Sequence, residues 1–255
     1  MRTRAGTLWI IALLPMLAPA AALAADKAAD IVYLKGAAVI ERQARTLKAQ
    51  LRGALFESDA IATRERSRAK MLFKDDSIVT LGAKSRLVVK KYLYDPAAKH
   101  AESVYELADG KLKAVVGGGA FKVTTPTAFA AARGTVFVVW YVPATGTTGI
   151  GVLEGAVSFG GIAGGPELTV TAGMMSTLTA GGEPTPLAPF DPAAGDGVVS
   201  ELFETPGPDL ALPEGRIEQI RLELLEQASA VATPPVDIQP AASTRTSVRV
   251  TVLFP

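Results

Sequence analysis

The chain has one histidine and no cysteine, which narrows the chemistry it can perform. His100 follows Asp95-Pro96 in a polar stretch that we expect to be a solvated loop. A triad with a cysteine, a two-histidine metal motif and a zinc cluster all need partners that the sequence lacks. The sequence therefore predicts neither a metal site nor a cofactor.

Asp75 and Asp76 are the next candidates, either as an acid/base pair or as a calcium site. Adjacent strand residues project to opposite faces, whereas a glycosidase needs two carboxyls that face each other across a substrate. Residues 74–76 separate two strand-like runs, so we predict a tight hairpin turn here. Gly117-Gly118-Gly119 lacks the Lys-Ser/Thr and the helix of a phosphate loop, and it predicts a flexible turn. No enzyme activity is predicted.

Three other residues are candidates for ligand binding. Tyr92 and Tyr94 share one face of a predicted strand among lysines, as in a sugar-binding strip, although strands also favour aromatic residues in their cores. Arg133, in Arg133-Gly134-Thr135, could meet an anionic group. In the structural alternative, Gly134 permits close backbone approach and Arg133 pairs with a carboxylate or caps strand carbonyls. Arg133→Ala would then lower stability, whereas a binding role predicts weaker binding by a folded protein.

The N-terminus predicts export. Arg2 and Arg4 precede an apolar run at residues 8–14, and Ala22-Leu23-Ala24 fits a small-x-small cleavage site. We expect residues 1–25 to be a cleaved signal peptide, and membrane contact only if this segment stays uncleaved as an anchor. Export without cysteine favours a periplasm of the Gram-negative type.

Charge is uneven along the chain. Residues 26–100 hold 16 Lys/Arg and 9 Asp/Glu, whereas residues 101–255 hold 8 and 16. The two halves could attract each other, or the basic half could face an anionic partner such as lipid headgroups or polysaccharide. The basic residues are dispersed along strand-like segments, which is typical of solvated faces. The predicted export argues against nucleic acid.

Residues 26–180 predict one all-β domain, with about a dozen short strands and no convincing helix. Tyr105 and Leu107 alternate with Glu106, which is typical of a strand with one face buried and the other exposed to solvent. Residues 136–142 are instead apolar at every position, so they predict a strand that is covered on both faces. A two-layer sandwich or a solenoid-like wrap satisfies both patterns. Gly36, Gly110 and Gly155 each follow a strand-like run, where we expect the sheet to bend.

Several ordered segments carry a family resemblance. They are residues 51–63, 69–82, 107–112, 121–126, 133–139 and 153–157, and together they resemble the FecR domain over roughly residues 30–160. The motif positions that we expect to be structural are Gly53, Asp59, Gly110, Pro126, Gly134, Thr135 and Gly155. One departure is Asp76, which stands where the family commonly has glycine.

The FecR resemblance implies an all-β periplasmic module. In the best-known members, this module passes a signal from an outer-membrane transporter to a cytoplasmic sigma factor, and a cytoplasmic segment and a transmembrane helix precede it. About 30 residues precede the module here, and they predict an export signal. We therefore do not expect anti-sigma activity.

The remaining residues predict a tail. Residues 181–213 are rich in proline and glycine and predict a linker or a surface-wrapping segment. Residues 214–230 predict a helix with Ile217, Ile220 and Leu224 on one stripe. Residues 247–255 predict a terminal strand suited to edge pairing, so that residues 214–255 form a helix plus a terminal strand. The helix could dock on the domain or on a partner.

We therefore predict a non-enzymatic binding or signal-relay module of the periplasm, with a tail that engages an envelope protein. The alternative is a carbohydrate-binding or carbohydrate-processing protein on a β-scaffold.

Overall fold

The computed structural model describes residues 26–97, 100–117, 119–192 and 199–203. The predicted signal peptide (1–25), C-terminal helix and terminal strand lie outside these residues. Within them, no helix is long and apolar enough to cross a membrane.

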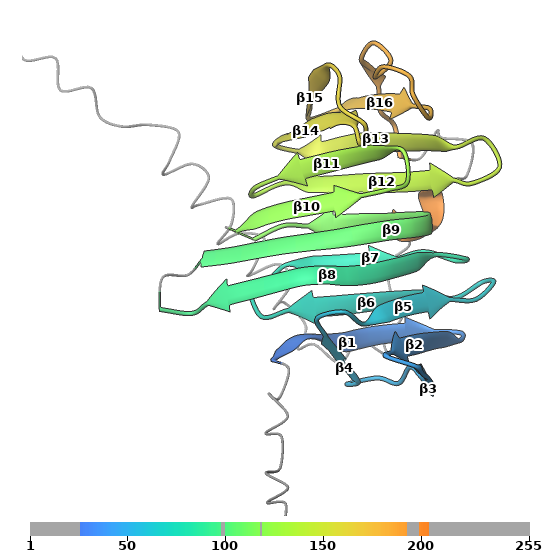
Figure 1. The fold of residues 1–255 in the computed structure, drawn as a ribbon, viewed down its shortest axis with the longest axis vertical. Coiled ribbons are helices and arrows are strands. Elements are labelled where there is room, and N and C mark those ends of the chain that lie inside the picture. The colour runs from blue at the N-terminus through green and yellow to red at the C-terminus, as the bar shows by residue number, and fades with distance from the viewer. Residues whose placement is uncertain (1–25, 98–99, 118, 193–198, 204–255) are drawn as a thin grey trace, which may run out of the picture.

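The described residues form two stacked sheets that share one long strand (Figure 1). Sheet A runs in the order β4 (Ala54–Phe56), β1 (Lys27–Lys35), β6 (Arg68–Phe73), β7 (Ile78–Leu81), β9 (His100–Val115), β12 (Val136–Val142), β13 (Thr147–Glu154), β16 (Met174–Leu178), β17 (Ala188–Pro189). Sheet B runs in the order β3 (Arg45–Lys48), β2 (Ala38–Arg42), β5 (Ala60–Thr63), β8 (Arg86–Asp95), β9, β10 (Ala120–Thr124), β11 (Ala128–Ala132), β14 (Ala156–Gly161), β15 (Glu167–Thr171). All pairings are antiparallel except β9 with β10. The all-β, two-layer prediction is confirmed.

Strand β9 joins the two layers. Its first part pairs with β8 and β10 in sheet B, and from Gly110 onward it pairs with β7 and β12 in sheet A. Gly110 has a φ of +83°, a backbone conformation that glycine adopts without strain. The change of sheet therefore occurs at a residue without a side chain, where the sequence predicted a bend.

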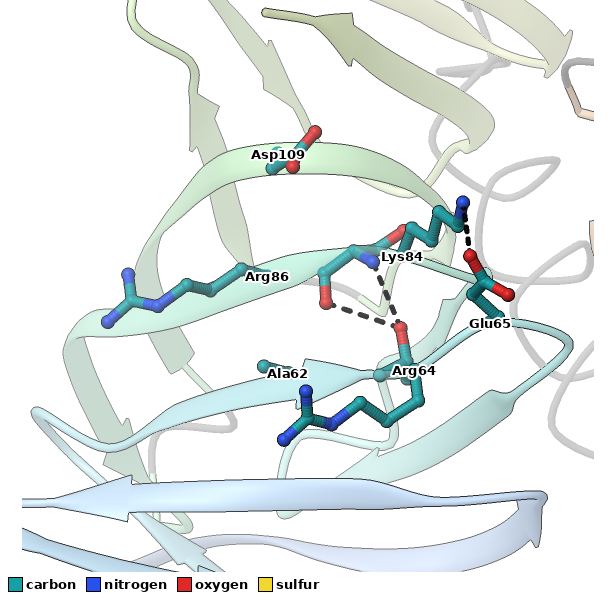
Figure 2. A pocket seen from close by; sticks show the side chains of 8 residues that line it. Ala62, Arg64, Glu65, Lys84, Arg86 and Asp109 are labelled. Carbon is teal, nitrogen blue, oxygen red and sulfur yellow. Dashed lines mark hydrogen bonds and ion pairs between the residues drawn. The ribbon is translucent and has the colours of Figure 1, made fainter.

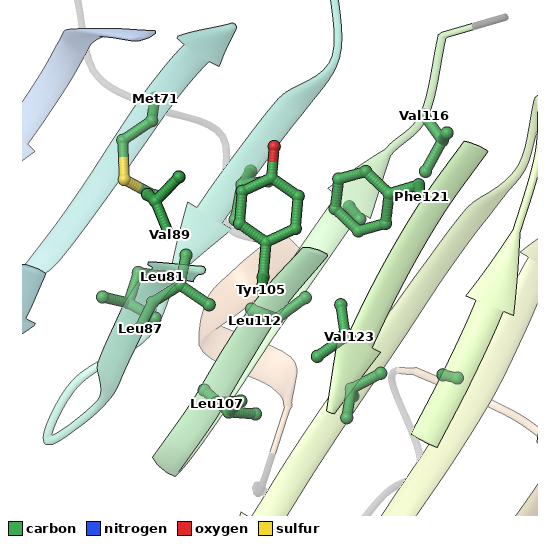
Figure 3. Close-up of a cluster of buried hydrophobic side chains, with 14 of the residues drawn as sticks. Met71, Leu81, Leu87, Val89, Tyr105, Leu107, Leu112, Val116, Phe121 and Val123 are labelled. Carbon is green, nitrogen blue, oxygen red and sulfur yellow. The ribbon is translucent and has the colours of Figure 1, made fainter. Parts of the chain in front are cut away.

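Side chains alternate along β9 as predicted. Tyr105 and Leu107 are fully buried between the sheets, while Glu106 points outward and forms an ion pair with Lys90 at 2.7 Å. Figure 3 shows Tyr105 within the apolar core, beside Phe121. The Tyr105 ring centroid lies 5.1 Å from that of Phe73 and 4.7 Å from that of Phe121. Aromatic packing thus fills the middle of the sandwich.

We expect Tyr105→Phe to stabilise the protein. The Tyr105 hydroxyl is buried and forms no well-formed hydrogen bond among the described residues, with Ser103 as its nearby polar side chain, and an under-satisfied buried hydroxyl costs free energy. Its removal should raise the free energy of unfolding by about 1 kcal/mol, measured by urea unfolding. A loss of stability would mean that the hydroxyl has a partner.

Strand β12 is covered on both sides, as its apolar run predicted. Phe137 and Val139 face the inter-sheet core, whereas Val138 faces outward and packs against Val199 and Leu202. Leu202 belongs to a short 3-10 helix, η1 (Ser200–Phe203). Part of the predicted linker therefore lies on the outer face of sheet A.

The structure corrects some details. His100 is the first residue of β9 and pairs with Asp95, so it is not in a loop. Strands β3, β4, β11, β16 and β17 were not predicted, because they are short or lack β-branched runs. Strand β17 and Phe190, which packs in the outer cluster of sheet A, fall inside the predicted linker. The turn at 74–76 is confirmed, with Asp76 at a φ of +61°.

Candidate functional site

Two turns of the same design lie where the chain crosses between the sheets. The Ser67 hydroxyl accepts a hydrogen bond from the Ala37 N–H at 2.9 Å and donates to the Glu65 carbonyl. The Ser85 hydroxyl likewise accepts from the Lys111 N–H at 2.9 Å and donates to the Ala83 carbonyl.

Each serine packs against the glycine that begins the crossing, Gly36 or Gly110. The residue before each serine, Arg66 or Lys84, has a positive φ. The two turns therefore hold the two crossings in the same way.

A shallow pocket of about 320 Å³ opens beside the second turn (Figure 2). We call it the corner pocket. Its lining residues are Ala62, Thr63, Arg64, Glu65, Lys84, Ser85, Arg86 and Asp109. It lies where the end of β5 meets the start of β8 and the sheet B part of β9.

Charged side chains surround the corner pocket. Lys84 Nζ lies 2.7 Å from Glu65 Oε1, and Arg86 Nη2 lies 2.7 Å from Glu41 Oε2. Figure 2 shows the Arg64 and Arg86 side chains extending away from the Lys84–Glu65 pair. Three cations and two carboxylates among the lining residues leave a net positive charge, which suits a polar or anionic contact.

The corner pocket offers little to catalysis. The hydrogen bond from Lys84 and its charge lower the pKa of Glu65, so this carboxyl stays ionised at neutral pH and is a poor general acid. The Ser85 hydroxyl already donates and accepts backbone hydrogen bonds, and no histidine lines the pocket to activate it. No group of three metal-ligating side chains exists in the described part of the chain.

The Arg133-Gly134-Thr135 junction connects β11 in sheet B to β12 in sheet A. Gly134 has a φ of +60°, and a Cβ atom there would meet nothing within 4 Å. The expectation of close backbone approach is therefore wrong, and the positive φ is the reason for glycine. Arg133 is exposed, and the junction repeats the order of a positive-φ residue followed by a hydroxyl residue.

Thr135 packs against Gly155 as Ser67 packs against Gly36 and Ser85 against Gly110. Gly155 has a φ of +82°. The Thr135 methyl group lies 2.7 Å from where a Cβ of Gly155 would stand. Its buried hydroxyl has no partner among the described residues. The crossing at Gly155 thus has the same packing of a hydroxyl residue against a glycine as the crossings at Gly36 and Gly110. It lacks the hydrogen bond from the backbone to the hydroxyl that those two crossings have.

A comparison with known protein families matches residues 59–158 to the family model described as FecR protein. This segment of the chain is similar to the FecR family. The match runs from the start of β5 into β14, and it includes Ser67, Ser85, Gly110, Thr135 and Gly155. The resemblance inferred from the sequence is confirmed.

A similar solved protein is a putative anti-sigma factor from Parabacteroides distasonis. Its crystal structures at 1.65 and 2.50 Å each share 17% sequence identity with this chain, at a TM-score of 0.43. The alignment covers 52% of this chain and 60% of that chain, so this chain spans about three fifths of that protein's length. No curated protein matches the chain.

Asp59, the first residue of the FecR match, is a buried anchor. Its carboxylate accepts from Arg42 Nε at 2.9 Å and from Arg42 Nη2 at 2.8 Å, and also from the Phe56 N–H at 2.9 Å. The hydrogen bond with Asp59 raises the pKa of Arg42, whose guanidinium stacks over the Phe56 ring. Asp59 therefore joins β2, β4 and β5.

Two other motif positions shape turns. The Gly53 N–H donates to the Gln50 carbonyl at 2.9 Å, and a Cβ on Gly53 would stand 2.8 Å from that oxygen. Pro126 is exposed in the β10–β11 turn, between Thr125 and Thr127, whose hydroxyls both bond to the Thr148 hydroxyl. These motif residues contact the framework and line no pocket described here.

Tyr92 packs at the edge of the core. Its ring centroid lies 5.5 Å from that of Phe73. Its hydroxyl accepts from the Asp75 N–H and donates to Asp75 Oδ1, each at 3.1 Å. Burial and the nearby Asp75 charge raise the pKa of Tyr92. Tyr94 is half-buried on the same strand. Neither tyrosine lines the corner pocket.

We expect Tyr92→Phe to lower the free energy of unfolding by about 1 kcal/mol at neutral pH, because the Asp75 N–H loses its acceptor. Since the folded pKa is raised, the stabilisation from Tyr92 is complete below the unfolded pKa of about 10 and is lost as pH rises beyond it. Urea unfolding of both proteins across this range should show the difference shrinking. A difference that grows with pH would contradict this account.

Sequence reasoning missed the corner pocket, although a signal exists. Arg66-Ser67-Arg68 and Lys84-Ser85-Arg86 repeat a basic-Ser-Arg triplet 18 positions apart. Each triplet spans a crossing turn and the start of a strand, β6 or β8. A search for short internal repeats would have paired the two turns.

Proposed function

We propose that this chain is a non-enzymatic binding or signal-relay module of the bacterial cell envelope. The observation that carries the proposal is the FecR match over residues 59–158, which spans the shared strand β9 and the crossings at Gly110 and Gly155. The FecR resemblance implies a module that receives and passes on signals. This chain would do so through contacts with another protein.

The chemistry of the corner pocket supports a binding role over an enzymatic one. Its serine is occupied by backbone hydrogen bonds, and its acidic residue Glu65 is held ionised. Charged side chains at its rim, such as Arg64, suit a polar contact with a protein surface. The pocket would add a polar contact to a partner that is held by the residues after Phe203, and it would not retain that partner by itself.

The N-terminal sequence supports a periplasmic location. Arg2, Arg4 and the apolar run at residues 8–14 have the pattern of an export signal. In the periplasm, the partner would be another envelope protein, engaged through the residues that follow Phe203. We do not propose anti-sigma activity for this chain.

No structural observation favours the carbohydrate alternative. One of the two tyrosines of the predicted sugar strip, Tyr92, has its hydroxyl bound to Asp75 and its ring packed against Phe73. A sugar platform needs an open aromatic face.

Recovery of envelope proteins tests the proposal. The full chain and a chain ending at Phe203 would each be used to capture proteins from solubilised Gram-negative envelopes. The shorter chain keeps all described residues, including the contact of η1 with sheet A. We expect a membrane protein that the full chain retains and the shorter chain loses. Identical profiles would overturn the proposal.

A further inference from the structure

The outer face of sheet A carries two adjacent rows of side chains. Strand pairing places Lys70 of β6 beside Thr80 of β7, and Thr80 beside Lys113 of β9. These residues alternate with buried inward residues such as Met71, so they point away from the core. The same register aligns an apolar outward row, formed by Leu72, Ile78, Val115 and Val136. We call the two rows together the amphipathic face.

Positive charge is concentrated on and beside the amphipathic face. Arg68 lies on β6, and Lys111 lies on β9, where its Nζ is 2.9 Å from Glu201 Oε1 of η1. Burial, together with repulsion from Lys113 and Arg68, lowers the pKa of Lys70. Partly buried cations that repel one another are stabilised when carboxylates approach them.

Several side chains on this side of sheet A are deeply buried although they point away from the core. Ile78 is 3% exposed, and Arg68 and Thr80 are each 6% exposed. Tyr33, which pairs with Lys70 on the neighbouring strand, is 7% exposed. These side chains are therefore already shielded from water, and the partly accessible side chains of the face are those of Lys70, Lys113, Leu72, Val115 and Val136.

The described chain approaches this face at its C-terminal end. Val199 and Leu202 pack against Val138, and the Phe203 ring centroid lies 4.6 Å from Lys113 Nζ. Residues 204–226 come next, with six Asp/Glu and two Arg. Their predicted helical part presents Ile217, Ile220 and Leu224 on one stripe. This segment therefore has the charge and the apolar stripe that match the amphipathic face.

We propose that residues 204–226 dock in cis on the amphipathic face, with their carboxylates against Lys70 and Lys113 and their apolar stripe against the apolar row. A helix over residues 214–226 would be about 20 Å long. Four neighbouring strands span about 15 Å, so the segment is long enough to cross β6, β7, β9 and β12. This goes beyond the proposed function, because the docked segment is withheld from any partner until it is released.

Trypsin cleavage of the full chain tests the docking. Cuts after Arg216 and Arg221 would be followed by mass spectrometry in the wild type and in Lys70→Glu/Lys113→Glu. We expect the reversal to speed these cuts about tenfold, because local release exposes the segment. The matched control, Lys90→Glu/Lys122→Glu, changes the same charge on sheet B and should leave the rate within about twofold. Adding Glu218→Lys/Glu223→Lys to the first variant should restore protection after Arg216 and Arg221, which is scored by mass separately from cuts at the two new trypsin sites that these substitutions create.

The outcomes are decisive even if the variant folds poorly. Raising salt from about 0.05 to about 0.5 M should speed the same cuts in the wild type, because salt screens the attraction. Equal cleavage in the wild type and the reversed chain, with no salt effect, would overturn the proposal. Protection that rises with protein concentration would place a second copy on the face instead, and it would also overturn docking in cis. Neither result bears on the capture of an envelope partner.

Discussion

Gly110→Ala should lower the free energy of unfolding by about 4 kcal/mol or prevent folding, because two costs add at this position. The φ of +83° is unfavourable for any residue with a Cβ. The added Cβ would also stand 2.6 Å from the Cα of Ser85, and the Ser85 backbone is fixed because its N–H donates to the Thr63 hydroxyl and its carbonyl accepts from the Thr63 N–H. Urea unfolding measures the change.

Gly134→Ala is the matched control for that change. Gly134 also has a positive φ, but its Cβ would meet nothing within 4 Å, so only the backbone cost of about 1 kcal/mol applies. The difference between the two variants isolates the close contact at the crossing. Equal losses would show that β9 does not depend on the packing of Ser85 under Gly110.

Asp59→Ala should cost about 3 kcal/mol of stability, because it leaves the Arg42 guanidinium and the Phe56 N–H without their shared acceptor. Asp59 is 1% exposed, so water cannot take the place of its carboxylate as the acceptor for Arg42 and the Phe56 N–H. The Arg42 side chain is 34% exposed, which keeps the loss below that of a fully buried pair. Urea or thermal unfolding measures it.

Two controls accompany Asp59→Ala. Asp59→Asn keeps an oxygen for the Phe56 N–H but removes the charge, so we expect roughly half the loss. Glu65→Ala breaks the exposed pair with Lys84, where both side chains are largely in water, and should change stability little. A loss in Glu65→Ala equal to that in Asp59→Ala would contradict the anchor role of Asp59.

Periodicity predicted the parts of the fold that depend on local pattern. Tyr105 and Leu107 alternate with Glu106, so one face of β9 was predictable, and the apolar run 136–142 marked a strand covered on both sides. The glycines at 36, 110 and 155 marked bends, and the structure places each of them at a crossing between sheets. A strand without β-branched residues, such as β11, carries no such pattern.

Features that depend on distant residues could not be read from the sequence. The corner pocket forms because β5, β8 and β9 meet, and Asp109 is more than 40 positions from Ala62. The role of Tyr92 depends on Asp75, which lies on another hairpin. The packing of η1 on Val138 joins segments about 60 positions apart. Periodicity predicts which face of a strand a residue lies on, but it does not predict which distant residue that side chain contacts.

The proposed relay through a protein partner is tested most directly by quantifying the envelope proteins that are captured by the full chain and by the chain ending at Phe203. The account predicts at least one membrane protein that the full chain enriches and the shorter chain does not. Lys70→Glu/Lys113→Glu, which should release residues 204–226, is expected to capture more of it than the wild type. Equal recovery of every envelope protein by the full and the shortened chain would contradict the account.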